Sequence, residues 1–223
     1  MALILNIETA TTNCSVALAK NGKTIALKEV NDKSYSHSER LHVYIQDVLE
    51  KSGNQLKDLD AIAISKGPGS YTGLRIGVSA AKGLCYSLDI PLISVLTLNS
   101  LMLQITTQKG FIVPMLDARR LEVYSAIYDH NCKMIRDTKA EILNANSFKD
   151  LLNDDDVYFI GSGVEKSKLL IKHKNAHFVE DKLPSANEMN ILSFEKYSNS
   201  DFENVAYFEP YYLKDFVAVK RKS

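Results

Sequence analysis

Apolar residues in the first hundred positions follow the two spacings of regular secondary structure. Short apolar or alternating runs predict five strands, at residues 3–7, 14–19, 24–30, 61–65 and 91–95. Apolar residues three and four positions apart predict helices at residues 37–51 and 71–88, and Ser36 with Glu39 forms a capping box before the first of them. The order is therefore three strands, a helix, a strand, a helix and a strand.

The second hundred positions repeat this order. Strands are predicted at residues 111–116, 122–129, 134–143 and 157–161. Ser147 is placed to cap a short helix, and Ser185 with Glu188 forms a capping box for a helix that ends near residue 197. A β-β-β-α-β-α unit that occurs twice predicts an α/β fold of two similar lobes with a cleft between them, an N-terminal lobe of residues 1–104 and a C-terminal lobe of residues 105–223.

The two halves also match at individual positions. When ILNIETATTNCSVAL is laid over IVPMLDARRLEVYSAI, Glu8 falls opposite Asp117 at the end of the first strand of each half. Gly67 and Gly69 likewise match Gly161 and Gly163. We therefore expect Glu8 and Asp117 to face each other across the cleft.

Composition narrows the class of protein. The 223 residues are 45% hydrophobic, and Lys+Arg and Asp+Glu are equal at 27 each, so no overall basic field favours nucleic acid. The opening MALILNIETA has no basic segment, and Asn6 and Glu8 break its apolar run, which argues against a signal peptide or a membrane span. Cys14, Cys85 and Cys132 lack the spacing of a disulfide framework or a zinc site. We expect a cytoplasmic protein.

The stretch KGPGSYTGLRIG, residues 66–77, joins a strand to a helix and has the outline of a phosphate cradle. A P-loop needs Lys followed by Ser or Thr at the helix start, but here Gly73 is followed by Leu74 and Arg75. The dinucleotide fingerprint needs a third glycine where this chain has Thr72. The glycines need another explanation.

One face of the helix at residues 71–88 carries small side chains. Gly73, Gly77, Ala80 and Leu84 form a stripe between an apolar face and a polar face. An interior glycine costs about 0.5–1 kcal/mol relative to alanine, so two on one face indicate a compensating gain in packing. That gain comes either from close packing on the lobe's own sheet or from another helix docked at the stripe.

These motifs resemble a known family. Duplicated lobes of this order are similar to the actin, sugar-kinase and heat-shock ATPase superfold. The chain resembles the TsaB (YeaZ-like) family over nearly its whole length, through ILNIETATTNCSVAL, HSERL, KGPGSYTGLRIGVSAAKGL, DARR at residues 117–120, and PYYLKDFV. KGPGSYTGLRIG is specific enough to identify the family by itself.

The resemblance implies a non-catalytic subunit that binds and activates TsaD. TsaD transfers a threonylcarbamoyl group to the adenosine next to the anticodon of ANN-decoding tRNAs. The resemblance also implies that TsaE joins the complex and hydrolyses ATP, that TsaC supplies threonylcarbamoyl adenylate, and that tRNA is bound only through the complex.

The resemblance also favours the docking interpretation of the small-residue stripe. We expect the two helices of the first lobe to bind TsaD or, in its absence, a second copy of this chain. Gly77→Leu should then abolish the complex and leave the monomer folded. The residues expected at this interface are His37, Leu41, Tyr71, Gly73, Leu74, Gly77, Ala80, Ala81 and Leu84.

The residues that would hold phosphate differ from those of a working lobe in this superfold. Neither ETATTNCS nor DARRLEV contains the glycine that lets a backbone approach an anion, and Glu8 stands where the family more often has Asp. We interpret Glu8, Thr9, Asp117, Arg119 and Arg120 as a vestigial phosphate cleft. The arginines would fill the phosphate site, bind an anion, or form salt bridges to Glu8 or Asp117 that tie the lobes together. No cofactor is expected, although weak or interfacial binding of ATP or ADP is left open.

Metal-dependent catalysis is not expected. By resemblance, catalysis of the TsaD type needs two histidines four apart on one helix, whereas His37 and His42 are five apart and lie about 140° from each other around a helix. No base is recognisable near Ser70 and Thr72, which argues against a hydrolase that acts on peptides or esters. An alternative function is a stand-alone ATP-dependent transferase or kinase that uses the cleft, and it requires nucleotide turnover by the isolated chain.

Basic residues lie close to the end of the chain, at Lys220, Arg221 and Lys222. We interpret them as a frayed, solvated terminus, with a contact to the tRNA backbone as the alternative. The alternative predicts that their removal weakens tRNA binding by the complex in a salt-dependent way.

Overall fold

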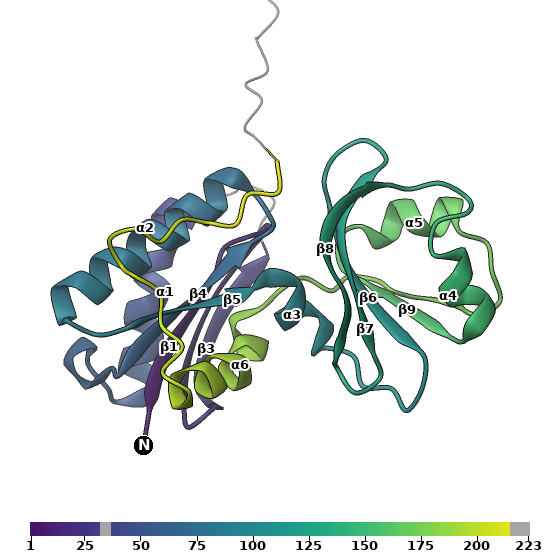
Figure 1. Ribbon diagram of the computed structural model, residues 1–223. Helices are drawn as coiled ribbons and strands as arrows, with labels where there is room; N and C mark the ends of the chain where they lie inside the picture. The colour runs from purple at the N-terminus through teal and green to yellow at the C-terminus, as the bar shows by residue number, and fades with distance from the viewer. Residues whose placement is uncertain (32–36, 215–223) are drawn as a thin grey trace, which may run out of the picture.

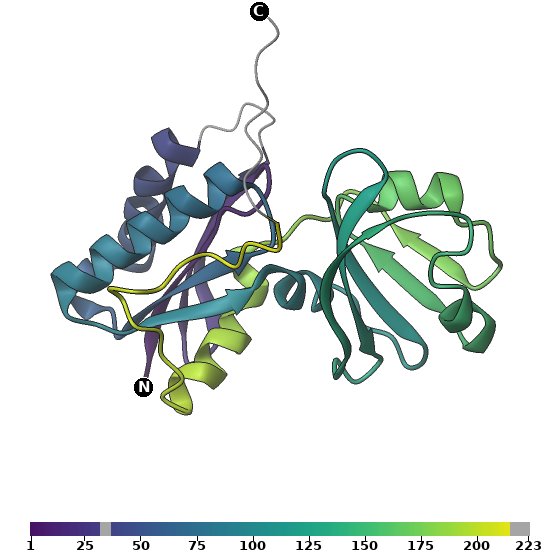
Figure 2. The same ribbon diagram turned by 45° about the horizontal axis from the view of Figure 1, so that its top comes forward.

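The computed structural model describes residues 1–31 and 37–214, and the predictions about Ser36, Lys220, Arg221 and Lys222 lie outside these ranges. The chain forms two lobes, each built around a five-stranded sheet (Figures 1 and 2). No helix within the two ranges is both long enough and apolar enough to cross a membrane.

The first sheet contains the five strands expected from the first half of the sequence. They are β1 (Leu3–Glu8), β2 (Asn13–Lys20), β3 (Lys23–Asn31), β4 (Ala61–Gly67) and β5 (Leu92–Leu96), in the order β3-β2-β1-β4-β5. β1 pairs antiparallel with β2 and parallel with β4, with Ile7 opposite both Val16 and Ile64. The helices of this half are α1 (His37–Ser52), the short 3-10 helix η1 (Leu56–Asp58), α2 (Tyr71–Leu88) and α3 (Thr97–Met102).

The second sheet repeats this arrangement and confirms the predicted duplication. Its strands are β6 (Phe111–Asp117), β7 (Glu122–Asp129), β8 (Met134–Ile142), β9 (Val157–Ile160) and β10 (Ala176–Val179), in the order β10-β9-β6-β7-β8. The helices are α4 (Lys149–Asp154), α5 (Val164–Leu170) and α6 (Ala186–Ser198). Strand β10 and helix α5 are additional to the elements predicted from the sequence.

Helices cover both faces of the first sheet, which explains why its strands are apolar at successive positions rather than at alternate ones. Along β1, Leu3, Leu5 and Ile7 belong to the core under α1 and α2, whereas Ala2 and Ile4 belong to the core under α6. Successive side chains of a strand point to opposite faces, so a strand buried on both faces is apolar throughout.

The second sheet is covered in the same way, by α4 and α5 on one face and by α3 on the other. Val113 and Met115 of β6 pack in the core with α4 and α5, and Ile112 and Leu116 pack in the core with α3. Helix α3 follows β5 of the first sheet, and α6 follows β10 of the second. Each lobe therefore receives one covering helix from the other half of the chain, as the crossing segments in Figure 1 show.

The predicted C-terminal lobe of residues 105–223 is corrected at its end by this exchange. Ala186 and Met189 of α6 are fully buried in the same core as Ala63 of β4. Beyond α6, Glu203 forms an antiparallel bridge with Leu92 of β5. The described residues from 186 onward therefore pack mainly with the first lobe, and the boundary at residues 104 and 105 does not separate the lobes.

Two predicted helix caps take a different form. Ser147 does not cap α4, because its Oγ accepts the N–H of Asn144 at 2.9 Å and Phe148 precedes the helix. Ser185 caps α6 and accepts the N–H of Asn187 at 3.1 Å. The predicted capping box is not formed, because Glu188 accepts a hydrogen bond from the side chain of Asn187 instead of reaching back to the cap.

Candidate functional site

The turn between β1 and β2 contains a carboxyl group that is completely buried. Oε1 of Glu8 accepts the N–H of Ala10 at 2.6 Å, and Oε2 has no hydrogen-bond partner among the described residues. Burial raises the pKa of Glu8 to about 7, and the hydrogen bond from Ala10 opposes that rise. Near neutral pH this carboxyl group is therefore partly uncharged.

The same turn is fixed against the N-terminal end of α2. The hydroxyl of Thr9 donates to the carbonyl oxygen of Gly73 at 2.8 Å. The carbonyl oxygen of Ala10 accepts the N–H of Ser70, which caps α2, at 2.7 Å. The turn therefore takes up the N–H of Ser70, which in a helix start is one of the groups that can bind an anion.

The glycines of the KGPGSYTGLRIG stretch are explained by this contact. A Cβ atom at Gly69 would overlap the carbonyl oxygen of Ala10, and one at Gly73 would overlap the carbonyl oxygen of Thr9. A Cβ at Gly77 would overlap the hydroxyl of Thr9. Of the two explanations for the stripe, close packing within the lobe accounts for both Gly73 and Gly77, so neither glycine needs a partner helix.

The turn between β6 and β7 has a matching geometry but a different charge. Oδ1 of Asp117 accepts the N–H of Arg119 at 2.6 Å, as Glu8 accepts an N–H two residues further on in the first turn. Nζ of Lys166 lies 2.7 Å from the same oxygen of Asp117. Arg119 and Arg120 have φ angles of 72° and 52°, which residues other than glycine adopt infrequently.

The predicted salt bridges of these arginines are not present. Within residues 1–31 and 37–214, neither Arg119 nor Arg120 pairs with Glu8 or Asp117, and Lys166 is the cation beside Asp117. The expectation that Glu8 and Asp117 face each other also fails, because Glu8 is completely buried whereas Asp117 lines the cleft. Sequence alignment of the two halves identified the paired acids correctly but not their different exposure.

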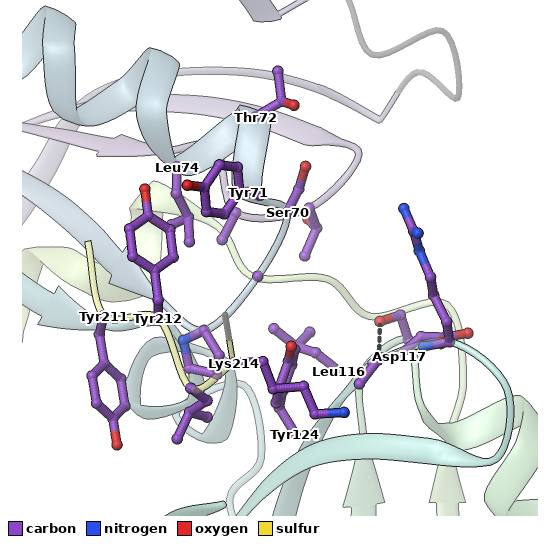
Figure 3. A pocket seen from close by; sticks show the side chains of 18 of the residues that line it. Ser70, Tyr71, Thr72, Leu74, Leu116, Asp117, Tyr124, Tyr211, Tyr212 and Lys214 are labelled. Carbon is purple, nitrogen blue, oxygen red and sulfur yellow. Dashed lines mark hydrogen bonds between the residues drawn. The ribbon is translucent and has the colours of Figure 1, made fainter. Parts of the chain in front are cut away.

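A cavity of about 670 Å³ separates the two turns. Figure 3 shows Ser70, Tyr71 and Thr72 from the start of α2 on one side, with Leu116 and Asp117 from the end of β6 opposite them. The remaining walls come from both turns, Tyr124, Ser162, Leu183 and residues 211–214. Arg119 also lines this space, so the cleft has one basic side chain without an ion-pair partner among the described residues.

Residues 203–214, the C-terminal strap, run along α2 and reach the second lobe (Figures 1 and 2). Nζ of Lys82 donates to two carbonyl oxygens of the strap at 2.9 and 3.1 Å. The ring of Tyr212 lies 4.6 Å from the ring of Tyr71 of α2. Lys214 then forms an ion pair with Glu122 of β7. The strap therefore connects the N-terminal end of α2 with the second lobe at one side of the cleft.

The residues predicted at the partner interface divide into two groups. His37, Leu41, Gly73, Leu74, Gly77 and Ala81 are buried within their own lobe. Tyr71, Ala80 and Leu84 are partly exposed. Buried His37 places Nε2 2.7 Å from the carbonyl oxygen of Thr11, so α1 also holds the first turn. Most of the residues predicted at the interface therefore lie between the helices and the rest of the first lobe, and not on the outer surface of the helices.

The outer surface of α1 and α2 contains residues that the sequence prediction did not include. Gly83 is exposed in the middle of α2, and a Cβ atom there would meet nothing within 4 Å. Tyr86 on α2 is 86% exposed, and Val43 on α1 is 53% exposed. The signal that could have identified this surface is an interior helix glycine opposite the apolar stripe, where packing within the lobe cannot explain it.

The histidines lie apart in the structure. His37 is buried at the start of α1 and His42 is exposed on the same helix. Among the residues that the structure describes, no three His, Cys, Asp or Glu side chains are grouped as a metal ion requires.

Comparisons with known proteins identify the family. The TsaD family model, described as tRNA N6-adenosine threonylcarbamoyltransferase, matches residues 31–221. The tRNA threonylcarbamoyladenosine biosynthesis protein TsaB of Escherichia coli (strain K12) is 31% identical over 226 residues, which cover 98% of this chain and 97% of that protein. The chain belongs to the TsaB family. The TsaB protein of Haemophilus influenzae is 28% identical and covers 98% of the chain and 96% of its own length.

Solved structures agree with this assignment. YeaZ from Pseudomonas aeruginosa superposes with a TM-score of 0.82 and 25% identity, over 96% of this chain and all of that one. Component A of the (R)-2-hydroxyglutaryl-CoA dehydratase of Acidaminococcus fermentans has a TM-score of 0.50 and 11% identity, and shows similarity of fold alone. The fold is the predicted one, two similar lobes of the actin, sugar-kinase and heat-shock ATPase superfold.

Part of the chain is also similar to the transferase itself. The tRNA N6-adenosine threonylcarbamoyltransferase of Bacillus subtilis is 35% identical over 107 residues, which cover 41% of this chain and 31% of that protein. The chain is therefore similar to TsaD proteins as well as to TsaB proteins.

Proposed function

We propose that this chain is a non-catalytic subunit in the synthesis of threonylcarbamoyladenosine on tRNA, and that it binds and activates TsaD. The observation that carries the proposal is the first turn. Its backbone is packed against the start of α2, where the carbonyl oxygen of Ala10 accepts the N–H of Ser70 at 2.7 Å. In a nucleotide-binding lobe that N–H would be available to a phosphate.

The state of the two acids supports the same proposal. Glu8 is buried with a pKa of about 7, and Asp117 is paired with Lys166 at 2.7 Å. A metal–nucleotide complex needs carboxylates that are ionised and free to approach the metal. Neither acid meets both conditions, so the cleft is poorly suited to phosphoryl transfer.

We place the TsaD contact on the outer face of α1 and α2, which lie side by side on one face of the first sheet. Exposed Gly83 and partly exposed Ala80 allow a partner helix to approach closely. Tyr86 on α2 and Val43 on α1 offer exposed apolar surface on the same two helices. An exposed interior glycine weakens a helix by about 0.5–1 kcal/mol, which a docked backbone would offset.

The kinship of the two proteins supports TsaD as the occupant. A subunit related to its partner presents the same helices that the partner presents, so the two can pair about an approximate two-fold axis. Without TsaD, the same face pairs two copies of this chain. TsaE and tRNA join through the TsaD complex, and the complex works in the cytoplasm.

The test is reconstitution of the whole chain with TsaD from the same organism. Threonylcarbamoylation of tRNA is assayed with TsaC, TsaE, ATP, threonine and bicarbonate, and each component is omitted in turn. We expect activity to disappear when this chain is omitted, and the chain alone neither to consume ATP nor to modify tRNA. Full activity without the chain would contradict the activator role.

The same experiment separates the alternative function. The cavity of about 670 Å³ between the lobes is the observation that favours a stand-alone ATP-dependent transferase or kinase. That function requires ATP turnover by the isolated chain, and turnover should then be lost when Asp117 is replaced by Asn.

A further inference from the structure

The ammonium group of Lys166 donates to three oxygen atoms at the junction of β6 and β7. Nζ donates to Oδ1 of Asp117 at 2.7 Å, to the carbonyl oxygen of Arg120 at 2.7 Å and to the carbonyl oxygen of Glu122 at 2.9 Å. A lysine ammonium has three donors and no acceptor, so each of its protons has one partner. The Lys166 side chain is only 13% exposed.

These three oxygens come from the turn between β6 and β7 rather than from separate surface groups. The left-handed conformations of Arg119 and Arg120 bend the turn so that two main-chain carbonyls and one carboxylate converge. Carboxylate and carbonyl oxygens are the ligands that hard cations take in proteins. Without a cation these oxygens would repel one another, and the carbonyl oxygen of Arg120 would lose its donor. The other two oxygens would keep one backbone N–H each.

A neighbouring lysine–acid pair lacks this construction. Lys168, two residues further along α5, pairs with Glu180, but the two side chains are 55% and 46% exposed. Exposed pairs of that kind contribute little to stability. The two pairs differ in the lysine, because Lys166 is 13% exposed whereas Asp117, at 48%, is as exposed as Glu180.

We propose that the β6–β7 turn is a cation-binding site that this chain fills with its own ammonium group, delivered from α5 by Lys166. The site carries one carboxylate and two neutral carbonyls, so it matches a monovalent cation of the size of ammonium or potassium. The bound ammonium fixes the turn and thereby holds Arg119 at the wall of the cleft.

The first lobe supplies an internal comparison. Counting forward from the matched pair Gly67 and Gly161, Lys166 falls opposite Thr72, so the first turn has no equivalent ammonium group. There the acid, Glu8, is buried and its pKa is raised. In the first turn the charge of the acid is therefore reduced by protonation, whereas in the second turn it is balanced by an ammonium group. The proposed cation site does not depend on the docking of TsaD.

Two variants of the full chain test the proposal because they remove the same charge but leave different space. Lys166→Ala opens the pocket, whereas Lys166→Met keeps it filled with an uncharged chain. The melting temperature is measured in potassium chloride, ammonium chloride and choline chloride at equal ionic strength. Lys168→Ala is the matched control.

We expect both Lys166 variants to melt roughly 5 °C below the parent chain in choline chloride. Potassium or ammonium should restore Lys166→Ala by at least half of that loss and leave Lys166→Met unchanged. The Lys168→Ala control should stay close to the parent in all three salts. A melting temperature of Lys166→Ala that is the same in all three salts, or equal responses of the two Lys166 variants to the salts, would overturn the proposal.

A second measurement on the unaltered chain covers the case in which the variants do not fold. Exchange of the ammonium protons with water is followed by nuclear magnetic resonance of the lysine side chains. The Lys166 signal should exchange at least tenfold more slowly than that of Lys168. Equal exchange rates would show that the ammonium group is not enclosed and would refute the site.

Discussion

At the scale of single residues, the two matched acids show how one position in a repeat can be used in two ways. Glu8 and Asp117 each accept an N–H from the residue two positions further on. Glu8 is completely buried, whereas Asp117 lies at the surface beside a lysine. Burial disfavours ionisation of the first acid, and a neighbouring cation offsets the charge of the second.

Glu8→Gln should stabilise the protein in a manner that depends on pH. The folded pKa of about 7 lies above the ordinary value of 4.5, so the stability associated with the protonated acid is complete below about pH 4.5 and is lost as the pH rises through 7. Gln cannot ionise, so the variant should gain up to roughly 3 kcal/mol in free energy of unfolding at pH 8 and little at pH 5. Urea denaturation at several pH values measures the difference.

The control for this prediction is Glu195→Gln, at an exposed position on α6. Its effect on the free energy of unfolding should be small and independent of pH. If the difference between Glu8→Gln and the parent chain were the same at pH 5 and pH 8, the raised pKa of Glu8 would be contradicted.

At the scale of elements, α2 uses glycine on two different faces for two different reasons. Gly73 and Gly77 face the first turn, where a Cβ atom would overlap Thr9. Gly83 faces outward and has no neighbour within 4 Å. Only the glycine without a neighbour within its own lobe has a role that a partner could explain.

Leucine substitutions on the two faces should therefore have opposite consequences. Gly77→Leu is expected to disrupt the fold, because the leucine side chain would overlap Thr9 and Ile64. This prediction replaces the expectation from the sequence that the Gly77→Leu monomer stays folded. Gly83→Leu is expected to leave the circular dichroism spectrum and melting temperature nearly unchanged and to weaken TsaD binding at least tenfold. Isothermal titration calorimetry measures the affinity.

Glu195→Leu on α6 is the matched control, since it adds an exposed leucine to the opposite face of the first lobe. This variant should bind TsaD as the parent does. Equal affinity of Gly83→Leu and the parent chain would exclude this face of α2 from the interface.

At the scale of the whole molecule, the two halves depend on each other through exchanged helices. Met189 of α6 is fully buried against the first sheet, although it lies in the second half of the sequence. Leu98 and Leu101 of α3, from the first half, are fully buried in a core of the second sheet. A cut between the halves would therefore remove a covering helix from both sheets.

Met189→Ala should loosen the first lobe and leave the second lobe protected. A large-to-small change at a fully buried position costs about 2–5 kcal/mol, and the loss should increase amide hydrogen exchange in β1 and β4. Leu152→Ala in α4, also buried, should instead increase exchange in β6 and β9. If Met189→Ala increased exchange mainly in the second sheet, the helix exchange would be refuted.

Much of the fold could be predicted because it depends on patterns that are local in the chain. Apolar spacing located nine of the strands and the long helices α1 and α2 close to their observed limits. The residue types at Ser185 and Glu188 located the start of α6. The short helix α5 and strand β10 were missed, because seven and four residues carry too little periodicity to stand out. Ser147 had the residue type of a cap, but its hydroxyl bonds to a loop N–H instead.

The sequence by itself determined the duplicated order of elements, the matched acids of the two turns and the membership of the TsaB family, because each is a pattern of residue types along the chain. Only the tertiary structure decided that Thr9 meets Gly73, that Lys166 meets Asp117 and that α6 covers the first sheet. These contacts join residues far apart in the chain, and each depends on how two elements approach, which no periodic pattern records.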